Sequence, residues 1–327
     1  MSADSITVLR CAPQLRLAKL LKADGSFVDY DSPRLFSAYE HAISDLTALA
    51  NGLQTLQGQT QQCVVRGALV DGPAVRGIRR LLHRDPETGD EPTLREVPRR
   101  WVALDMDGLD RPAGVEAADL LGCAGVVIPA LPSAFYGVSC IVQASAGHGR
   151  KPGSRLRLWF WLDRPVGRAE LEVWFAGHSV DAVSFRAAQV IYTAAPAFEV
   201  GLADHLPVRL ARLSGLSEVS VPPSEALQLP PRPRRASFEI PAVKAAEWAE
   251  NAFRRGVAAV ATAPTDKRHV TCVKVAFNLA CLCHEGRLYE SNVRSALGAA
   301  LEHAGKEAEE AYKVFDWAMG QASGAAA

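Results

Sequence analysis

The sequence predicts an α+β protein in which a mixed region precedes a bundle of helices. Apolar segments of strand length alternate with segments of helix length through residues 1–220. Residues 221–241 are rich in proline, which favours an extended linker. Residues 242–327 are rich in alanine, nearly free of proline and apolar at helical spacing. We therefore expect a first domain, a linker and a helical domain with these boundaries.

The composition is that of a globular chain. Of the 327 residues, 48% are hydrophobic and 22% are charged, which excludes a wholly disordered protein. Lys and Arg (36) balance Asp and Glu (36), so binding of nucleic acid would depend on local basic patches. Seven scattered cysteines, no signal-peptide pattern and no long apolar run lead us to expect a cytoplasmic protein without a membrane partner.

The first part of the chain predicts two strands and one long helix. Residues 5–11 and 63–69 have the apolar character of buried strands. Between them, apolar residues recur at helical spacing over residues 32–56, which predicts an amphipathic helix. A polar segment rich in arginine follows over residues 71–98 and is expected to be a loop.

The segment from Trp101 to Gly108 contains the most informative acids. Four apolar residues lead into Asp105-Met-Asp107, and Gly108 then predicts a turn, so both acids would stand at the exit of a buried strand. Alternate side chains of a strand share a face, so the two carboxylates would point the same way. Neighbouring carboxylates repel unless a cation lies between them, which favours Mg²⁺ or Mn²⁺ with substrate phosphates. An ordinary solvated turn would show the same residues.

Cationic groups follow along the chain. Residues 146–154 form a basic, glycine-rich loop that contains His148 and leads into a strand over residues 155–163. One face of that strand carries Arg155, Arg157, Trp159 and Trp161. Such a face suits phosphates and bases, although a half-exposed strand at a sheet surface has the same pattern.

Asp181 and two arginines add to this set. Asp181 follows the basic strand after one predicted helix, and by itself such an acid is more often a helix cap than a ligand. Residues 208–213 alternate and contribute Arg209 and Arg212. These cations are of the kind that contact phosphates.

Four helices are predicted in the last domain, over residues 244–261, 266–285, 289–304 and 307–321. Gly286 and Gly305 are expected to end two of them as caps. A basic group stands where the second helix begins: Lys267, Arg268 and His269. It would hold a phosphate at the helix N-terminus or form a plain solvated cap.

Taken in this order, the motifs resemble the archaeo-eukaryotic primase superfamily. Leu104-Asp-Met-Asp107 is similar to its first motif, a hydrophobic residue followed by Asp-x-Asp, and Val180-Asp181 is similar to its third. Residues 145–165 and 189–196 look like the primase-polymerase modules of phages and plasmids, and the helical tail looks like the domain that follows them. The resemblance covers nearly the whole chain and implies a primase-type (RRM-like) catalytic core before the helical bundle.

The second motif departs from the family pattern. In many relatives a histidine stands within the strand, at the position of Arg157 here. The nearest histidine in this sequence is His148, in the preceding loop. Either residue would contact the nucleotide phosphates, and we favour His148.

The resemblance implies a DNA-dependent primase-polymerase of a mobile element. Its catalytic and metal-binding residues, with Mg²⁺ or Mn²⁺ as cofactor, would be Asp105, Asp107 and Asp181. Its nucleotide contacts would be His148, Arg157, Arg155 and Ser145. Residues expected to contact DNA are Arg79, Arg80, Arg209, Arg212, Lys267, Arg268 and His269. The partners would be single-stranded DNA, nucleoside triphosphates and a separate replicative helicase, because the sequence has no Gly-x-x-x-x-Gly-Lys-Ser/Thr loop.

Two other functions remain open. Asp105-Met-Asp-Gly-Leu109 also resembles haloacid-dehalogenase-like phosphatases, in which the first Asp is a nucleophile and the second a general acid. Leu109 stands where that family usually has Thr, and the motif comes late in the chain. The third hypothesis is a catalytically inactive DNA-binding replication protein on the primase fold.

Overall fold

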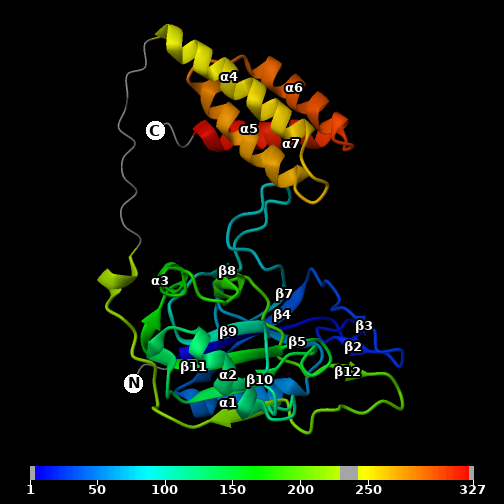
Figure 1. Cartoon of the computed structure of the whole chain (residues 1–327), viewed down its shortest axis with the longest axis vertical. Coiled ribbons are helices and arrows are strands. Elements are labelled where there is room, and N and C mark those ends of the chain that lie inside the picture. The colour runs from blue at the N-terminus through cyan, green and yellow to red at the C-terminus, as the bar shows by residue number, and fades with distance from the viewer. Residues whose placement is uncertain (1–3, 229–241, 324–327) are drawn as a thin grey trace. The chain divides into compact units, whose positions relative to one another are not determined.

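The computed structural model describes residues 4–228 and 242–323 (Figure 1). The chain divides into two compact units, residues 1–232 and 233–327, and each has its own hydrophobic core. The α+β class expected for the first unit and the helical class expected for the second are both observed. Among the described residues, no helix is both long enough and apolar enough to cross a membrane.

Two four-stranded antiparallel sheets form most of the first unit. One sheet has the order β5 (Gln62–Val65), β1 (Asp4–Arg10), β4 (Phe36–Ile43) and β7 (Ala74–Ile78). The other has the order β13 (Leu210–Leu213), β10 (Cys140–Ala144), β11 (Ser154–Val166) and β9 (Arg99–Leu109). Two small sheets complete the unit: β12 (Ala197–Phe198) with β2 (Leu20–Leu21) and β3 (Phe27–Val28), and β6 (Ala68–Leu69) with β8 (Leu94–Arg95).

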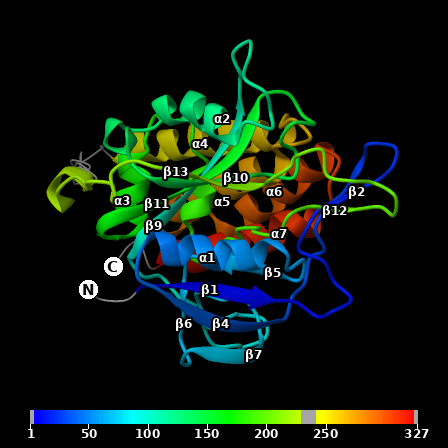
Figure 2. The same cartoon turned by 90° about the horizontal axis from the view of Figure 1, so that it is seen from below.

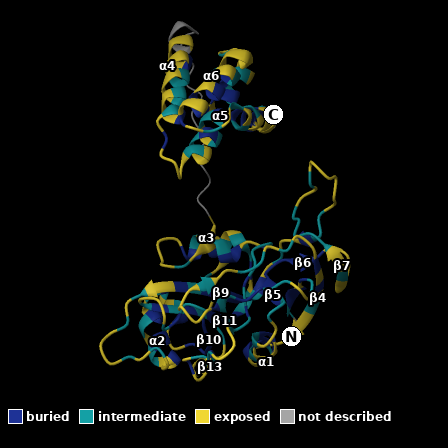
Figure 3. Ribbon diagram, turned by 90° about the vertical axis from the view of Figure 1, so that its right-hand side faces the viewer, coloured by how far each residue is buried: buried dark blue, intermediate teal, exposed yellow. Residues whose placement is uncertain are grey.

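The sheet of β9, β10 and β11 is covered on both faces. Helices α2 (Leu120–Val127) and α3 (Arg168–Trp174) pack on one face, against residues such as Leu104 and Phe160. Helix α1 (Leu46–Gln57) and strands β1 and β4 share a core with the other face, and α1 runs beside β1 (Figure 2). Buried residues are therefore concentrated along these strands (Figure 3).

The long helix expected over residues 32–56 is wrong. Residues Phe36–Ile43 form strand β4, which pairs with both β1 and β7. Helix α1 begins only at Leu46, after the Asp45 carboxylate caps it by accepting a hydrogen bond from the Ala48 N–H at 2.8 Å. The spacing of apolar residues does not distinguish one long helix from a strand followed by a shorter helix. Here residues 36–43 form a strand because they pair with β1 on one side and β7 on the other.

The turn expected at Gly108 is also wrong. Strand β9 continues to Leu109, which pairs with Ser154. Gly108 stays in the strand with φ of +83°, and a Cβ on Gly153 would lie only 2.9 Å from the Gly108 carbonyl carbon. The two glycines allow the backbones to approach closely at a register shift, so both acids lie within the strand rather than beyond it.

Strands β9 and β10 run parallel with β11 between them, since β11 is antiparallel to both. Helix α2 connects β9 to β10, which gives a split β-α-β arrangement. The last strand, β13, pairs with β10.

Part of the predicted linker belongs to the first unit. Asp163 accepts a hydrogen bond from the Val221 N–H at 3.1 Å, and Arg164 donates to the Pro222 carbonyl at 2.8 Å. The 3₁₀ helix η4 (Ser224–Leu227) then packs against α3. The first domain therefore extends beyond residue 220, and the rest of the predicted linker, residues 229–241, lies outside the described residues.

The second unit is a bundle of four helices, as expected: α4 (Ala242–Ala261), α5 (Arg268–His284), α6 (Glu290–His303) and α7 (Ala308–Ser323). Its core includes Leu279, Leu297 and Phe315. Gly286 and Gly305 follow α5 and α6 with φ of +67° and +83°. The residue after each glycine donates its N–H to a carbonyl five positions back, so the predicted glycine caps are confirmed as Schellman motifs.

Candidate functional site

The pairing of β9 with β11 places two acids opposite two arginines. Asp105 is opposite Arg157, and Asp107 is opposite Arg155. Arg157 binds Asp105 through two hydrogen bonds, from Nε to Oδ1 at 2.7 Å and from Nη2 to Oδ2 at 2.9 Å. Arg155 Nη1 lies 3.3 Å from Asp107 Oδ2. The expectation that both carboxylates share one face is confirmed. In this structure the cationic groups that contact them are the guanidinium groups of Arg157 and Arg155.

The two ion pairs differ in exposure. The side chains of Arg157 and Asp105 are 13% and 31% exposed, whereas Asp107 is 63% exposed. A forked, half-buried arginine–carboxylate pair is strong and specific, while a single exposed contact contributes little. The site therefore has an ordered inner pair and a loose outer pair that opens to solvent.

Two tyrosines border the inner pair. The rings of Tyr30 and Tyr192 stack with centroids 3.5 Å apart and planes 1° apart. Arg157 Nη1 donates to the Tyr192 carbonyl at 2.5 Å, so this segment and Asp105 hold one guanidinium between them. Burial raises the pKa of Tyr30 to about 12, and the neighbouring Arg157 charge partly opposes that increase. Both tyrosines therefore stay protonated at neutral pH.

Lys19 extends this aromatic border. Its ammonium lies 5.2 Å from the centre of the Tyr30 ring and 2.8 Å from Asp29. Neither Tyr30 nor Lys19 was found by sequence reasoning, because nothing in their own segment indicates a contact with a strand 75 residues later. Tyr192 lies in the segment 189–196 that carried part of the family resemblance.

The expectation that Trp159 and Trp161 would face a ligand is wrong. Their exposed fractions are 0% and 2%, and both belong to the core shared with α1. The Trp159 indole N–H donates to Gln143 Oε1 at 3.0 Å. The face of β11 is therefore divided along its length, with a polar site at one end and a packed core beyond it.

His148 is fixed inside the protein. Its side chain is fully buried, its Nδ1 accepts the Arg155 backbone N–H at 3.1 Å, and its Nε2 lies 2.9 Å from the Ala117 carbonyl. These partners require the neutral tautomer with the proton on Nε2. Neither ring nitrogen remains for a phosphate, so our preference for His148 is not supported. Arg157 is the candidate that lies beside Asp105.

Asp181 is the cap of a short helix. It precedes the 3₁₀ helix η3 (Ala182–Phe185), and its Oδ1 accepts the Val183 N–H at 2.9 Å. Helix η3 lies near β9, where the Ser184 hydroxyl is 3.4 Å from the Ala103 carbonyl. Within residues 4–228 and 242–323, no three His, Cys, Asp or Glu side chains come together in a way that could hold a metal. Asp181 therefore does not form a three-carboxylate cluster with Asp105 and Asp107.

Ser145 and Arg209 lie in the support of the basic loop. The Ser145 N–H donates to the Arg155 carbonyl at 3.0 Å, and its carbonyl accepts from Arg209 Nη1 at 2.9 Å. Arg209 is 4% exposed and also binds Asp204, with Nη2 to Oδ1 at 2.8 Å. Arg209 is therefore an internal ion-pair partner rather than a surface contact for DNA.

The other three arginines of the first unit that were expected to contact DNA have partners within the protein. Arg79 binds Asp85 and Asp90 within its own loop, at 2.6 and 2.9 Å. Arg80 donates to the Ala188 carbonyl at 2.7 Å, and exposed Arg212 donates to Thr47 at 3.0 Å. None of the three contacts Asp105 or Asp107.

The basic group of the second unit stands at the start of α5, as expected. Lys267 is the residue before the helix and Arg268 is its first residue. His269 Nδ1 lies 2.8 Å from Glu310 on α7. The hydrogen bond from Lys306 is the main cause that lowers the pKa of the Glu310 carboxyl, and the hydrogen bond from His269 is the next largest. One member of the group is thus tied to an acid.

No family model, curated protein or solved structure matches the chain. A functional assignment consequently depends on the residues and geometry described above.

The two ion pairs predict unequal effects on stability. Replacing Arg157 with Met leaves Asp105 half-buried without its forked partner and should lower the free energy of unfolding by about 1–3 kcal/mol. Arg155→Met, the matched control on the same strand, should cost less than about 1 kcal/mol because its pair is exposed. Urea unfolding of the full chain measures both. Equal losses would contradict the proposed difference between the inner and outer pairs.

His148 predicts a pH dependence. Burial lowers the pKa of His148 in the folded state, so below the unfolded pKa of about 6.5 the unfolded chain binds more protons. The stabilising contribution of neutral His148 is therefore complete above about pH 6.5 and decreases as pH falls from there toward the folded pKa.

The His148→Gln variant should lose less stability than the wild type between pH 7 and pH 5, as measured by thermal unfolding. Burial also lowers the pKa of His205, so some dependence should remain in the variant. Identical pH profiles for the two proteins would show that His148 is not held neutral.

Proposed function

We propose that the first unit is a nucleotidyltransferase of the primase-polymerase type, which joins nucleotides on a single-stranded DNA template. The observation that carries this proposal is the pairing of Asp105 and Asp107 with Arg157 and Arg155 on adjacent strands. Phosphoryl transfer needs acids that hold a divalent cation and cations that hold phosphates. Here both kinds of group stand side by side at the polar end of one sheet face.

The two acids fit a cation that arrives with the nucleotide. Mg²⁺ is usually bound through one or two carboxylates, and substrate phosphates and water complete its shell. Asp105 and Asp107 supply such a pair, and both are accessible to solvent. When bound, Mg²⁺ or Mn²⁺ would neutralise charge on the triphosphate during transfer. The proposed carboxylate set is thus two, with Asp181 outside it.

The arginines would exchange partners when the nucleotide binds. Without substrate, each guanidinium neutralises the carboxylate opposite it. A triphosphate offers oxygens with the same forked geometry, so Arg157 and Arg155 would turn to phosphate while the acids turn to the cation. Opposite charges remain paired before and after the exchange, which avoids an isolated half-buried charge.

The sheet supports the family resemblance in part. The split β-α-β arrangement of β9, α2 and β10 is that of ferredoxin-like, including RRM-like, folds. In such a fold the last strand pairs with the first, whereas β13 pairs with β10 here. The RRM-like assignment is therefore part of the proposal and differs from the standard strand order at this edge.

Template contacts would come from exposed basic groups. Arg212 and the loop around Arg79 are accessible in the first unit, and Lys267 and Arg268 begin α5 in the second. Phosphate contacts of this kind position a strand without reading its sequence. Single-stranded DNA, nucleoside triphosphates and a separate replicative helicase remain the proposed partners.

The phosphatase hypothesis receives less support from the site. The haloacid-dehalogenase-like family usually has a closing pair of acids beside its first motif, but among the described residues no third acid joins Asp105 and Asp107. An inactive DNA-binding protein has no use for the paired acids beyond their ion pairs. Both hypotheses are separated from the proposal by the same assay.

The deciding assay incubates the full chain with single-stranded DNA, labelled nucleoside triphosphates and Mg²⁺ or Mn²⁺. We expect short products made without a primer. Asp105→Asn and Asp107→Asn should each reduce synthesis by about a hundredfold or more, because each removes a cation ligand. Asp181→Asn and the matched exposed control Asp110→Asn should leave synthesis within about twofold, well under the 1.4 kcal/mol of a tenfold effect.

Three outcomes would oppose the proposal. The absence of products with either cation on several templates would end the polymerase assignment. Release of phosphate from small monoesters without synthesis would favour the phosphatase. DNA binding without catalysis, unchanged in the two Asp variants, would favour the non-enzymatic protein.

A further inference from the structure

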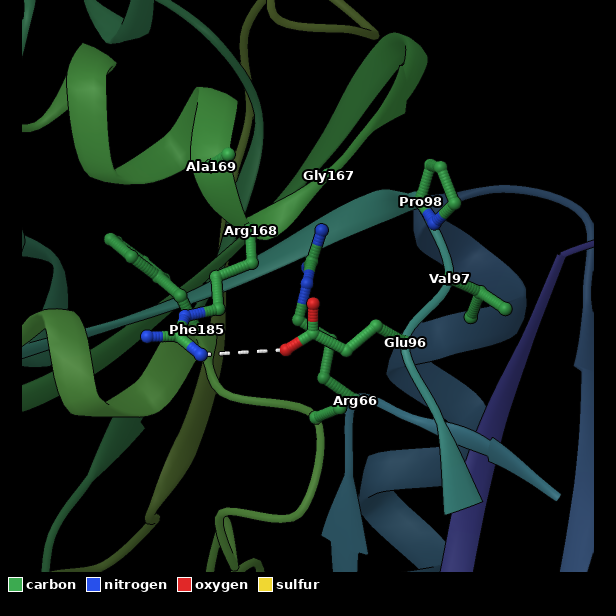
Figure 4. Close-up of a pocket in the computed structure, with 9 residues that line it drawn as sticks. Arg66, Glu96, Val97, Pro98, Gly167, Arg168, Ala169 and Phe185 are labelled. Atoms are coloured by element: carbon green, nitrogen blue, oxygen red, sulfur yellow. Dashed lines mark hydrogen bonds and ion pairs between the residues drawn. The ribbon is translucent and has the colours of Figure 1, made fainter. Parts of the chain in front are cut away.

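A cavity with charged side chains in its walls lies at the other end of β9 (Figure 4). Its volume is about 250 Å³, and its walls come from the residue after β5, the segment before β9, the start of α3 and the end of η3 with the segment that follows it. The lining residues used below are Arg66, Glu96, Val97, Arg168 and Phe185. Asp105 lies six positions after Arg99 along β9, so this cavity lies roughly 20 Å from the candidate active site.

Arg66 is a buried cation directed into this cavity, as Figure 4 shows. Its exposed fraction is 3%. Two hydrogen bonds engage it, from Nη1 to the Trp101 carbonyl at 2.5 Å and from Nη2 to the Val166 carbonyl at 2.6 Å. A guanidinium has five N–H donors, so three remain. Among the described residues, no carboxylate forms an ion pair with it.

Asp4, the acid whose charge acts on Arg66, already has another partner. Arg99 donates to the Arg66 carbonyl at 3.0 Å, and its own guanidinium binds Asp4 at 3.0 Å. Burial is the main cause that lowers the pKa of Arg66 to about 9, and the neighbouring Arg99 charge is the next largest. Arg66 thus remains charged at neutral pH, and a buried charge without a counter-ion is costly.

Glu96 and Arg168 form the rim of the cavity. Arg168 Nη1 lies 3.5 Å from Glu96 Oε1, and its Nε lies 2.7 Å from Glu172. Figure 4 marks the contact of Glu96 with Arg168, and among the described residues Glu96 makes no ion pair with Arg66. An oxyanion that binds Arg168 more strongly can displace the Glu96 carboxylate, because Glu96 is half exposed and its 3.5 Å contact with Arg168 is weak.

We propose that this cavity binds the oxyanion group of a small molecule, with Arg66 as the buried partner, Arg168 as the second cation and Glu96 as a competing carboxylate. The forked guanidinium matches a phosphate or a carboxylate in geometry. Val97 and Phe185 supply an apolar wall for the organic part of the ligand. The volume limits that part, because cavities for drug-sized ligands begin near about 300 Å³.

Calorimetric titration of the full chain with inorganic phosphate, AMP or acetate tests this proposal. All solutions are first freed of divalent metal with a chelating resin, so that the metal-dependent nucleotide site does not contribute. Saturable binding of phosphate and AMP but not of acetate would show that the site recognises a phosphate group. Binding of AMP but not of phosphate or acetate would show that the organic part is also needed. Binding of all three compounds would identify a general oxyanion site. Each of these results supports the proposal.

Three variants decide whether binding occurs in this cavity. Arg66→Gln should weaken the affinity at least about tenfold, because it removes charge-assisted hydrogen bonds. Glu96→Gln should strengthen it about threefold to tenfold by removing the competing anion. Arg164→Gln, a nearby arginine paired with Glu170 outside the cavity, should bind like the wild type.

The proposal is overturned if none of the three compounds binds saturably up to about 10 mM. It is also overturned if folded Arg66→Gln binds as tightly as the wild type. Circular dichroism shows whether Arg66→Gln folds. If it does not, Glu96→Gln decides, because that surface substitution leaves Arg66 and its backbone bonds in place, and unchanged affinity then contradicts the proposal.

Discussion

The antiparallel pairing of β9 with β11 is the constraint on which the rest of the first unit depends. This ladder aligns Asp105 with Arg157 and Asp107 with Arg155, and it aligns buried tryptophans farther along. Along both strands, successive side chains point alternately into two cores, one under α2 and α3 and one shared with α1. A shift of one residue would move the acids to the opposite face, away from the arginines.

The ladder ends differently at its two extremities, and both ends become polar sites. Near Ser154 the register shifts where Gly108 and Gly153 approach, beyond the acid–arginine pairs. At the other end the register shifts between Trp161 and Val166, and Arg66 bonds to a carbonyl from each strand. Irregular ends of a ladder leave backbone groups unpaired, and at this second end Arg66 satisfies two of them. The middle of the ladder is apolar and keeps the two ends apart.

Local patterns predicted what local chemistry determines. The acids on one strand face, the four helices and the caps at Gly286 and Gly305 follow from spacing and backbone preference, and all were anticipated. The helix expected over residues 32–56 failed because pairing of β4 with two distant strands outweighs its apolar spacing.

The same limit applies to the site. The burial of His148 depends on contact with Ala117, which no motif announces. Tyr30 approaches Arg157 only because the fold brings two distant segments together. In the sequence Arg66 looks like any residue after a buried strand, and only the structure shows that it is buried without a carboxylate partner among the described residues. Alternation along β11 showed which side chains share a face, but it did not show that the tryptophans are covered while the arginines are not.

The central claim is that Asp105 and Asp107 exchange their arginine partners for a divalent cation that arrives with a nucleotide. Electron paramagnetic resonance of free Mn²⁺ tests this directly, in titrations of the full chain with and without dATP, compared with dATP alone. The account predicts that the chain and dATP together retain more Mn²⁺ than the sum of what each retains alone, and that the double variant Asp105→Asn, Asp107→Asn removes this excess. Equal retention by the wild type and the double variant would contradict it.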